Sequence, residues 1–435
     1  MDNPTLRKTD PFLSTNGLCL AELNPEAMLR AFDAEMTRGL DGAPDALPMI
    51  PAFVTIDRPV PADTRVAVLD AGGTNLRVAT VVFDAQGKPH IEDYTRHRMP
   101  GTQGEVTVDA FYDGFADLLA PLAAKVACIG FCFSYVAEIT PDCDARLLRW
   151  TKQIKAPGVV NTMVGSNVRA RLALRGCDRP ITVLNDTVAT LLAGKSAGMA
   201  HHYASYVGFI LGTGTNTAYV ERNANIRKRN DLDAQGAMII NVESGSFSKV
   251  PQSRFDQLFD ATTADCCSYT FEKMIAGAYL GGLGGTILKE AAKASLFTPA
   301  TAQAVLTMPT PSSKDLNLFC QNPWLPPETF AALPMTEDDR RTALELCLAV
   351  YTRAALLTAV NIAAAVIRSG TGIDPLHPVA VNIDGSTYYR TTAASFASRV
   401  QGHLRDLLGP RGLHYELISV DEAPIIGAAV AGLTR

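Results

Sequence analysis

Long runs of one charge are missing from this chain of 435 residues, which has 39 basic and 44 acidic residues and a formal net charge of −5. Without a basic stripe or an acidic tail, we expect no nucleic-acid partner. Paired CxxC spacings are missing too. The nine cysteines are scattered, at positions 19, 128, 132, 143, 177, 266, 267, 320 and 347. This distribution predicts reduced thiols and gives no reason to expect a zinc cluster.

Targeting and membrane-spanning segments are also missing. The N-terminal stretch MDNPTLRKTDPFL lacks the apolar core of a signal peptide. The longest apolar tract, residues 354–367, is interrupted by Thr358 and Asn361, so we interpret it as a core helix. We therefore expect a cytoplasmic protein with no membrane partner. Its length and its 47% hydrophobic content favour a large core divided between two or three domains.

Helical and strand-like segments alternate along the chain. Residues 24–40 predict an amphipathic helix, because Asn24 can cap it, Pro25 fits the first turn and apolar residues recur at helical spacing. Further along, the patterns predict short helices and loops at residues 298–334 and one or two long helices at residues 338–368. A late strand is predicted at residues 379–383. The alternation indicates an α/β protein with two mixed sheets.

A glycine-rich turn between two strands is found twice. The first is in LDAGGTNLRV, residues 69–78, between the β-rich runs 66–69 and 78–83. The second is GTGTN, residues 212–216, between the runs 207–211 and 217–221. Each pair of runs is close enough to form a hairpin, and the repetition predicts two structurally similar halves.

Glycine turns of this kind can bind phosphate. They let backbone N–H groups approach phosphate oxygens, and Thr74 and Thr213 add hydroxyl donors. A single turn of either sequence is weak evidence, because such a turn more often reflects ordinary tight-turn geometry. Two matched turns favour a polyphosphate held from both halves. Neither turn has the spacing of a Walker A loop or of the Rossmann fingerprint.

Other polar residues stand out from apolar surroundings. Asn185-Asp186-Thr187 lies at the carboxyl end of the strand at residues 181–185 and at the start of a helix, where a capping role and a catalytic role can coexist. Singly, the others could be solvated strand ends or surface residues: Ser134, Thr151, Lys152, Asn216, Glu243 and Glu272.

Taken together, these segments resemble the hexokinase family. LDAGGTNLRV and LGTGTNTAYVE resemble the two phosphate motifs of that family. GFCFSYV and RWTKQIKAPG resemble its sugar-binding signature, and VLNDTVAT its catalytic segment. NVESGSF and FEKMIAGAYLGG match the segments that bring glutamates to the sugar. The resemblance runs in order from about residue 28 to the last helix.

The resemblance implies an α/β, two-domain actin-like (ribonuclease H-like) fold, with a mixed sheet and flanking helices in each domain and a cleft between them. We expect an N-terminal helix and connection at residues 1–65 that contacts the large domain. The small domain would span residues 66–184 and the large domain residues 185–435, and the last helix, about 424–435, could return to the small domain. A single catalytic unit is expected.

The implied activity is transfer of the γ-phosphoryl group of ATP to the 6-hydroxyl of a hexose such as glucose. Asp186 matches the general base, and Lys152 matches the lysine that reaches the sugar and the transferred group. The resemblance assigns hexose binding to Ser134, Thr151, Lys152, Asn185, Asp186, Asn216, Glu243 and Glu272.

The implied cofactors are ATP and Mg²⁺. Mg²⁺ would arrive with ATP rather than bind protein ligands directly, and Asp70 would act on it through water. The nucleotide site is expected to include Asp70, Gly72, Gly73, Thr74, Asn75, Gly212, Thr213, Gly214, Gly385 and Gly427. The C-terminal SVDEAPIIGAAVAG departs from the family's acid-Gly-Ser-Gly run with lysine, so an altered purine preference is an alternative to ATP.

Two other interpretations remain open at this stage. One is a kinase for a modified sugar, or a sugar kinase of the repressor-related group; the cysteine-rich zinc motif typical of that group and a clear helix-turn-helix module are not found in this sequence, which argues against the second form. The other is an actin-like nucleotide-binding assembly protein, which would have no use for Glu243 and Glu272. The expected partners are the hexose and ATP, and the candidate residues fit glucose, fructose, mannose and amino sugars alike.

Overall fold

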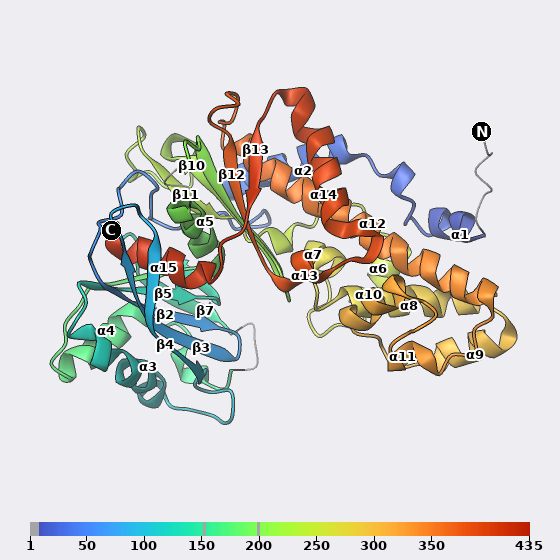
Figure 1. The fold of residues 1–435 in the computed structure, drawn as a ribbon, viewed down its shortest axis with the longest axis horizontal. Helices are drawn as coiled ribbons and strands as arrows, with labels where there is room; N and C mark the ends of the chain where they lie inside the picture. The colour runs from blue at the N-terminus through green and yellow to red at the C-terminus, as the bar shows by residue number, and fades with distance from the viewer. Residues whose placement is uncertain (1–7, 151–153, 198–200) are drawn as a thin grey trace.

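The computed structural model describes residues 8–150, 154–197 and 201–435. It contains two mixed β-sheets of five and six strands, with helices on both (Figure 1). We call the part built on the five-stranded sheet the small lobe and the part built on the six-stranded sheet the large lobe. Thr151, Lys152 and their neighbour Gln153 lie outside the described residues.

The small-lobe sheet has both parallel and antiparallel pairs. In spatial order its strands are β4 (Pro89–Arg98), β3 (Asn75–Phe83), β2 (Val66–Gly72), β5 (Cys128–Phe133) and β8 (Ile181–Leu184). β2 pairs antiparallel with β3 and parallel with β5. A separate hairpin of β6 (Val136–Ile139) and β7 (Ala145–Arg149) follows β5.

Side chains of β2 alternate between two apolar layers. Ala67, Leu69 and Ala71 belong to the same buried cluster as α3 (Val108–Ala123) and α4 (Val164–Leu174). Val66 and Val68 face the opposite layer, which contains α15 (Ala423–Leu433). The C-terminal helix therefore returns to the small lobe and contacts β2 and β5.

The large-lobe sheet contains the second glycine turn. Its strands in spatial order are β1 (Ile50–Pro51), β11 (Ala237–Asn241), β10 (Thr215–Arg222), β9 (Ser205–Leu211), β12 (Val379–Asp384) and β13 (Tyr415–Ile418). Its apolar cluster includes α2 (Pro25–Leu40), where the Asn24 side chain accepts a hydrogen bond from the Ala27 amide as the sequence predicts. The other face contacts α5 (Asp186–Ala197).

Within the part of the chain that the structure describes, one helix is long and apolar enough, by length and composition alone, to cross a membrane. This is α12 (Glu337–Arg368), and 89% of its most apolar window is buried inside the fold. Buried Val350, Leu357 and Ile362 belong to the core cluster of the large lobe. The burial agrees with the core helix expected from the sequence, and the segment forms one helix rather than two.

Shorter helices complete the large lobe. They are α1 (Thr9–Thr15), α6 (Arg254–Asp260), α7 (Thr270–Ile275), α8 (Leu280–Lys293), α9 (Pro299–Thr307), α10 (Ser313–Gln321), α11 (Glu328–Ala331), α13 (Ser386–Arg390) and α14 (Phe396–Leu408). Figure 1 shows α8 to α11 gathered at the end of the molecule opposite the small lobe. Residues 298–334 thus form short helices and loops, as expected.

The two lobes meet at a pair of helices, α5 and α15 (Figure 1). Glycines let their backbones touch there. A Cβ added at Gly427 in α15 would lie 1.8 Å from the Ala189 carbonyl oxygen in α5. A Cβ at Gly130 in β5 would lie 1.9 Å from the Ala428 oxygen, and one at Gly208 in β9 would lie 2.5 Å from the Thr187 oxygen. A larger residue at Gly427 would push α5 and α15 apart, one at Gly130 would push α15 off β5, and one at Gly208 would push α5 off β9.

Candidate active site

The first glycine turn is open to solvent. β2 runs to Gly72 and β3 begins at Asn75, so the turn is tighter than the sequence suggested. Thr74 and Asn75 are exposed, and a Cβ built on Gly72 would meet no atom within 4 Å. The turn is held by hydrogen bonds from the Met99 amide to Thr74 O (3.0 Å) and from Tyr135 Oη to Gly73 O (2.8 Å).

The second glycine turn is fixed on several sides. The Gly212 carbonyl accepts hydrogen bonds from the Gly277 amide (2.9 Å) and from Thr387 Oγ1 (2.7 Å). The Ala278 amide donates to Thr213 O at 3.0 Å. Gly385, which precedes α13, lies against the same turn, and its φ of 116° is a conformation that side chains rarely allow. The segment between α7 and α8, together with α13, holds this turn in place.

Carboxylates gather around one arginine at the base of the first turn. Asp70 and Arg77 are register partners in the β2–β3 hairpin, with Arg77 Nε 2.7 Å from Asp70 Oδ2. Arg77 Nη1 also donates to Glu422 Oε2 at 2.9 Å. Burial raises the pKa of Asp70 to about 6, and the negative charges of Asp186 and Glu422 add to the rise while Arg77 opposes it.

Asp384, at the end of β12, belongs to the same acid cluster. Burial raises its pKa, Asp186 and Glu422 raise it further, and Arg77 opposes the shift. We name Asp70, Asp384 and Glu422 with Arg77 the acid cluster. Its excess of carboxylate oxygens suits a hard divalent cation such as Mg²⁺.

A second polar group forms where β10 begins and β11 ends, and we call it the amide–glutamate cluster. Asn216 Nδ2 donates to Asn241 Oδ1 (2.8 Å), and Asn241 Nδ2 donates to Glu243 Oε1 (2.8 Å). Burial raises the pKa of Glu243, with Asp186 adding to the rise, while the bond from Asn241 and the charge of Arg149 lower it. The chain of amides fixes the Glu243 carboxylate in one orientation.

Glu272 reaches this region from α7. Its Oε2 accepts a hydrogen bond from the Thr215 amide at 2.8 Å, directly after the second glycine turn. A Cβ on Gly214 would come within 2.5 Å of that oxygen, so glycine is needed for the approach. Burial raises the pKa of Glu272 to about 7; the Thr215 bond opposes the rise, and the charge of Glu243 adds to it.

Asp186 stands between the two clusters. It is the first residue of α5, where the positive end of the helix dipole stabilises a negative charge. Asn185 caps the helix by accepting a hydrogen bond from the Thr187 amide at 2.8 Å. The charge of Asp186 raises the pKa of Asp70 and Asp384 on one side and of Glu243 on the other. Asp186 is thus close to both groups.

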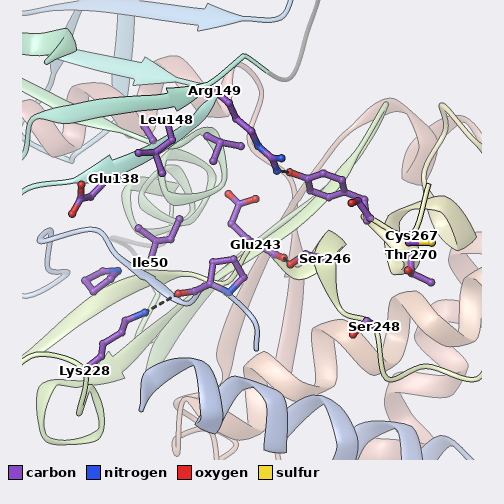
Figure 2. A pocket seen from close by; sticks show the side chains of 16 residues that line it. Ile50, Glu138, Leu148, Arg149, Lys228, Glu243, Ser246, Ser248, Cys267 and Thr270 are labelled. Atoms are coloured by element: carbon purple, nitrogen blue, oxygen red, sulfur yellow. Dashed lines mark hydrogen bonds between the residues drawn. The ribbon is translucent and has the colours of Figure 1, made fainter. Parts of the chain in front are cut away.

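A cavity of about 630 Å³ opens beside Glu243, between the β6–β7 hairpin and the large lobe. Figure 2 shows Arg149 and Glu243 directed toward one another across it. The Arg149 guanidinium donates a hydrogen bond to Tyr269 Oη and lies over that ring, 5.4 Å from its centroid. Arg149 ends β7 and Tyr269 precedes α7, so this contact joins the two lobes.

The remaining residues predicted for the site are Ser134, Thr151, Lys152 and Gly427, and of these Ser134 and Gly427 belong to neither cluster. Ser134 follows β5, and its amide donates to the Ala71 oxygen at 3.2 Å, which brings it next to the first turn. Thr151 and Lys152 lie outside the described residues. Gly427 is buried against α5, where it has a packing role, and the nucleotide contact expected of it stays a prediction.

Sequence reasoning missed several residues of the site. Arg77 could have been found, because the two-residue turn makes it the cross-strand partner of Asp70. The end of the late strand likewise marked Asp384, although only Gly385 beside it was chosen. Nothing local pointed to Arg149 or Tyr269, since their contact depends on how the two lobes meet.

The fold is the two-domain actin-like fold of sugar kinases. It is similar to a hexokinase crystal structure at a TM-score of 0.79 and 24% identity, covering 97% of this chain and 98% of the other. It is also similar to a hexokinase from Schistosoma mansoni complexed with glucose, at a TM-score of 0.77 and 23% identity over the same shares.

Family models agree with the fold. Two models described as hexokinase match residues 18–196 and 206–434. Hexokinase-5 of Oryza sativa subsp. japonica is 30% identical over 426 residues, covering 88% of this chain and 82% of the relative. Hexokinase-1 of Schizosaccharomyces pombe is 29% identical over 427 residues, covering 92% and 85%. The chain belongs to the hexokinase family, whose members transfer phosphoryl groups from ATP to hexoses.

Proposed function

We propose that this chain phosphorylates the 6-hydroxyl of a hexose such as glucose, with Asp186 as the general base. The observation that carries the proposal is the position of Asp186, which is coupled electrostatically to the acid cluster and to the amide–glutamate cluster. A phosphoryl donor on one side and a sugar on the other would both lie within its reach. Phosphoryl transfer needs chiefly this kind of positioning, with charge stabilisation.

The amide–glutamate cluster supplies the groups that a hexose needs. Asn216 and Glu243 offer donors and acceptors held by their own hydrogen bonds, and Glu272 offers a second carboxylate. Rigid polar groups bind a ring hydroxyl by direct hydrogen bonds, and they disfavour an analogue that lacks it because they would remain unpaired. From the sequence, Ser134, Thr151 and Lys152 are assigned to the same ligand.

The glycine turns would hold the polyphosphate. Backbone amides of Gly72 and Gly73, with the hydroxyl of Thr74, can donate from the small lobe, and Thr213 with Gly214 can donate from the large lobe. Mg²⁺, when bound with ATP, neutralises charge on the phosphates, and Asp70 and Asp384 are the carboxylates that would hold it, directly or through water. Asp186 accepts the proton of the 6-hydroxyl as that oxygen attacks.

The cavity beside Glu243 favours a second candidate, a kinase for a hexose that carries a substituent. Its walls include Ile50, Val136 and Leu148, which would accept an apolar group attached to the sugar. An assembly protein is not favoured, because it would leave the amide–glutamate cluster without a ligand. We also propose a cytoplasmic location, since all nine cysteines are free thiols.

The test is Asp186→Asn, which keeps the size of the side chain. We expect kcat to fall by about 10²- to 10⁴-fold, the usual contribution of a general base. Turnover is followed by coupled release of ADP across a panel of plain and N-acylated hexoses, and hexose affinity is measured by calorimetry. Affinity should change little. Near-normal turnover in the variant would show that Asp186 is not the base.

A further inference from the structure

Two adjacent cysteines lie on the loop between α6 and α7. Cys266 and Cys267 are free and exposed, with their Sγ atoms 3.3 Å apart. Asp260, the last residue of α6, directs Oδ2 toward them: this oxygen is 3.7 Å from Cys266 Sγ and accepts a hydrogen bond from the Cys267 amide at 2.8 Å. One atom from each residue therefore lies within 4.8 Å of the other two.

These separations are close to those of a tetrahedral metal site. With Zn–S bonds of about 2.3 Å and Zn–O bonds of about 2.1 Å, two sulfur ligands lie about 3.8 Å apart and a sulfur and an oxygen about 3.6 Å apart. The observed 3.3 and 3.7 Å differ from those values by half an ångström or less. Two exposed side chains can make that adjustment by rotating about their χ1 bonds.

We propose that Asp260, Cys266 and Cys267 bind a thiophilic divalent cation such as Zn²⁺ or Cd²⁺, with water in the fourth position. Binding replaces two S–H bonds by two metal–sulfur bonds and releases two protons to solvent. Thiolate ligands select soft or borderline ions, so the hard Mg²⁺ that accompanies ATP would not compete. The CxxC spacing absent from the sequence is not needed, because Asp260 comes from the preceding helix.

A buried lysine orients the carboxylate of this site. Lys273 Nζ lies 2.6 Å from Asp260 Oδ1 and also donates to Thr263 Oγ1 and to the Asp265 carbonyl. Lys273 is 3% exposed, so this arrangement is fixed within the fold. The Lys273 ammonium binds Oδ1 of Asp260, so Oδ2 of Asp260 faces the two thiols. Contacts of this kind behind a metal ligand hold it in a binding orientation.

The proposed ion would lie at the edge of the cavity already described. Cys267 lines that cavity, as Figure 2 shows. Two residues further along is Tyr269, which contacts Arg149 of the small lobe, and α7 then carries Glu272. An ion that ties residues 260–267 together would restrict this loop, and we expect it to alter hexose affinity as a secondary effect.

The experiment titrates the reduced full-length protein with Cd²⁺, in a phosphine reductant and without chelator. Thiolate-to-cadmium charge-transfer absorption in the ultraviolet should saturate at one ion per chain. Cys266→Ser and Cys267→Ser should each weaken binding by about tenfold or more, and Asp260→Asn should weaken it too. Cys177→Ser, a half-buried thiol of the small lobe, is the matched control and should bind as wild type.

Thermal unfolding provides a second readout. A bound ion stabilises the folded chain by mass action, so Zn²⁺ should raise the unfolding midpoint of the wild type and of Cys177→Ser but not of Cys266→Ser. The proposal is overturned if the absorption is absent, if it persists in Cys266→Ser, or if magnesium at the same concentration abolishes it. All the cysteines replaced are exposed or half-buried, so the variants should fold.

Discussion

The two glycine turns have related sequences but different surroundings. The first, between β2 and β3, is open above Gly72 and is held by one backbone amide and one tyrosine hydroxyl. The second, between β9 and β10, is held by two backbone amides, a threonine hydroxyl and the close approach of Gly385. Its first strand residue, Thr215, is bound to Glu272 as well.

This difference indicates that the two turns would bind a ligand in different ways, one as a fixed surface and one as an adaptable surface. The second turn is a fixed surface, coupled through Glu272 to the amide–glutamate cluster. The first turn has open space above Gly72, and the Asp70–Arg77 ion pair lies at its base. Sugar and phosphate would thus meet one rigid surface and one adaptable surface.

The largest expected effect comes from breaking the fixed turn. Gly385→Ala should lower the free energy of unfolding by about 3 kcal/mol or more, because its backbone conformation excludes side chains and a Cβ would lie 2.3 Å from the Leu211 oxygen. Urea unfolding followed by circular dichroism measures this. A loss no greater than that of an exposed-site substitution would mean that the second turn is not rigid.

Glu272→Gln tests the contact between Glu272 and the fixed turn. The quantity measured is the pH dependence of the free energy of unfolding. Because the folded-state pKa of Glu272 is about 7 and its ordinary value is 4.5, the folded chain keeps a proton that the unfolded chain has released between those values. The contribution of this group to stability therefore falls as pH rises from about 4.5 to 7. The glutamine of the variant does not ionise, so the variant does not lose stability in this pH range. At pH 8 its free energy of unfolding should exceed that of the wild type by about 1–3 kcal/mol.

The measurement is urea unfolding of both proteins at pH 5 and pH 8 without sugar. The stability difference should favour the variant more at pH 8 than at pH 5, while its hexose affinity falls at both. A difference independent of pH would mean that Glu272 is already ionised well below neutral pH, contrary to the raised pKa.

The open turn is tested by Gly72→Ala. A methyl group meets no protein atom there, so the free energy of unfolding should change by less than about 0.5 kcal/mol. The same methyl would occupy the space that a phosphate needs, so kcat/KM for ATP should fall by about tenfold, or about 1.4 kcal/mol. The KM for hexose should stay constant. Unchanged ATP kinetics would remove this turn from the phosphate site.

The smallest effects come from a matched pair of hydroxyl deletions, Tyr135→Phe and Thr387→Val. Each removes one hydrogen bond to a turn carbonyl, Gly73 O in the first case and Gly212 O in the second. Each should lower stability by about 1 kcal/mol. The KM for ATP should rise more in Tyr135→Phe, because the second turn keeps its bonds from Gly277 and Ala278. Equal increases would contradict the division between an adaptable and a fixed turn.

Local patterns were sufficient to predict the helices and hairpins on which the site is built. The cap at Asn24, the two glycine turns and the long helix α12 follow from residue spacing alone. These features depend on interactions between residues close together in the chain. Candidate residues at the ends of strands, such as Asp186 and Glu243, could be found for the same reason.

Contacts between distant segments could not be predicted in this way. Arg77 and Glu422 are 345 residues apart, and Arg149 and Tyr269 are 120 apart. Their pairing depends on how the lobes are arranged, which leaves no periodic signal in the sequence. Gly427 is a related case: its close contact with the backbone of α5 could not be predicted from the segment in which it stands.

The meeting of α5 and α15 has a mechanical consequence. At Gly427 the main chain of α15 touches the main chain of α5 at Ala189, and no side chain of Gly427 separates the two helices. One lobe can then swivel on the other without rearranging an intervening layer, while sideways slippage is blocked by atoms already at their closest approach. The contact between α5 and α15 would act as a hinge. A small rotation there would produce a large displacement at the far edge of each lobe.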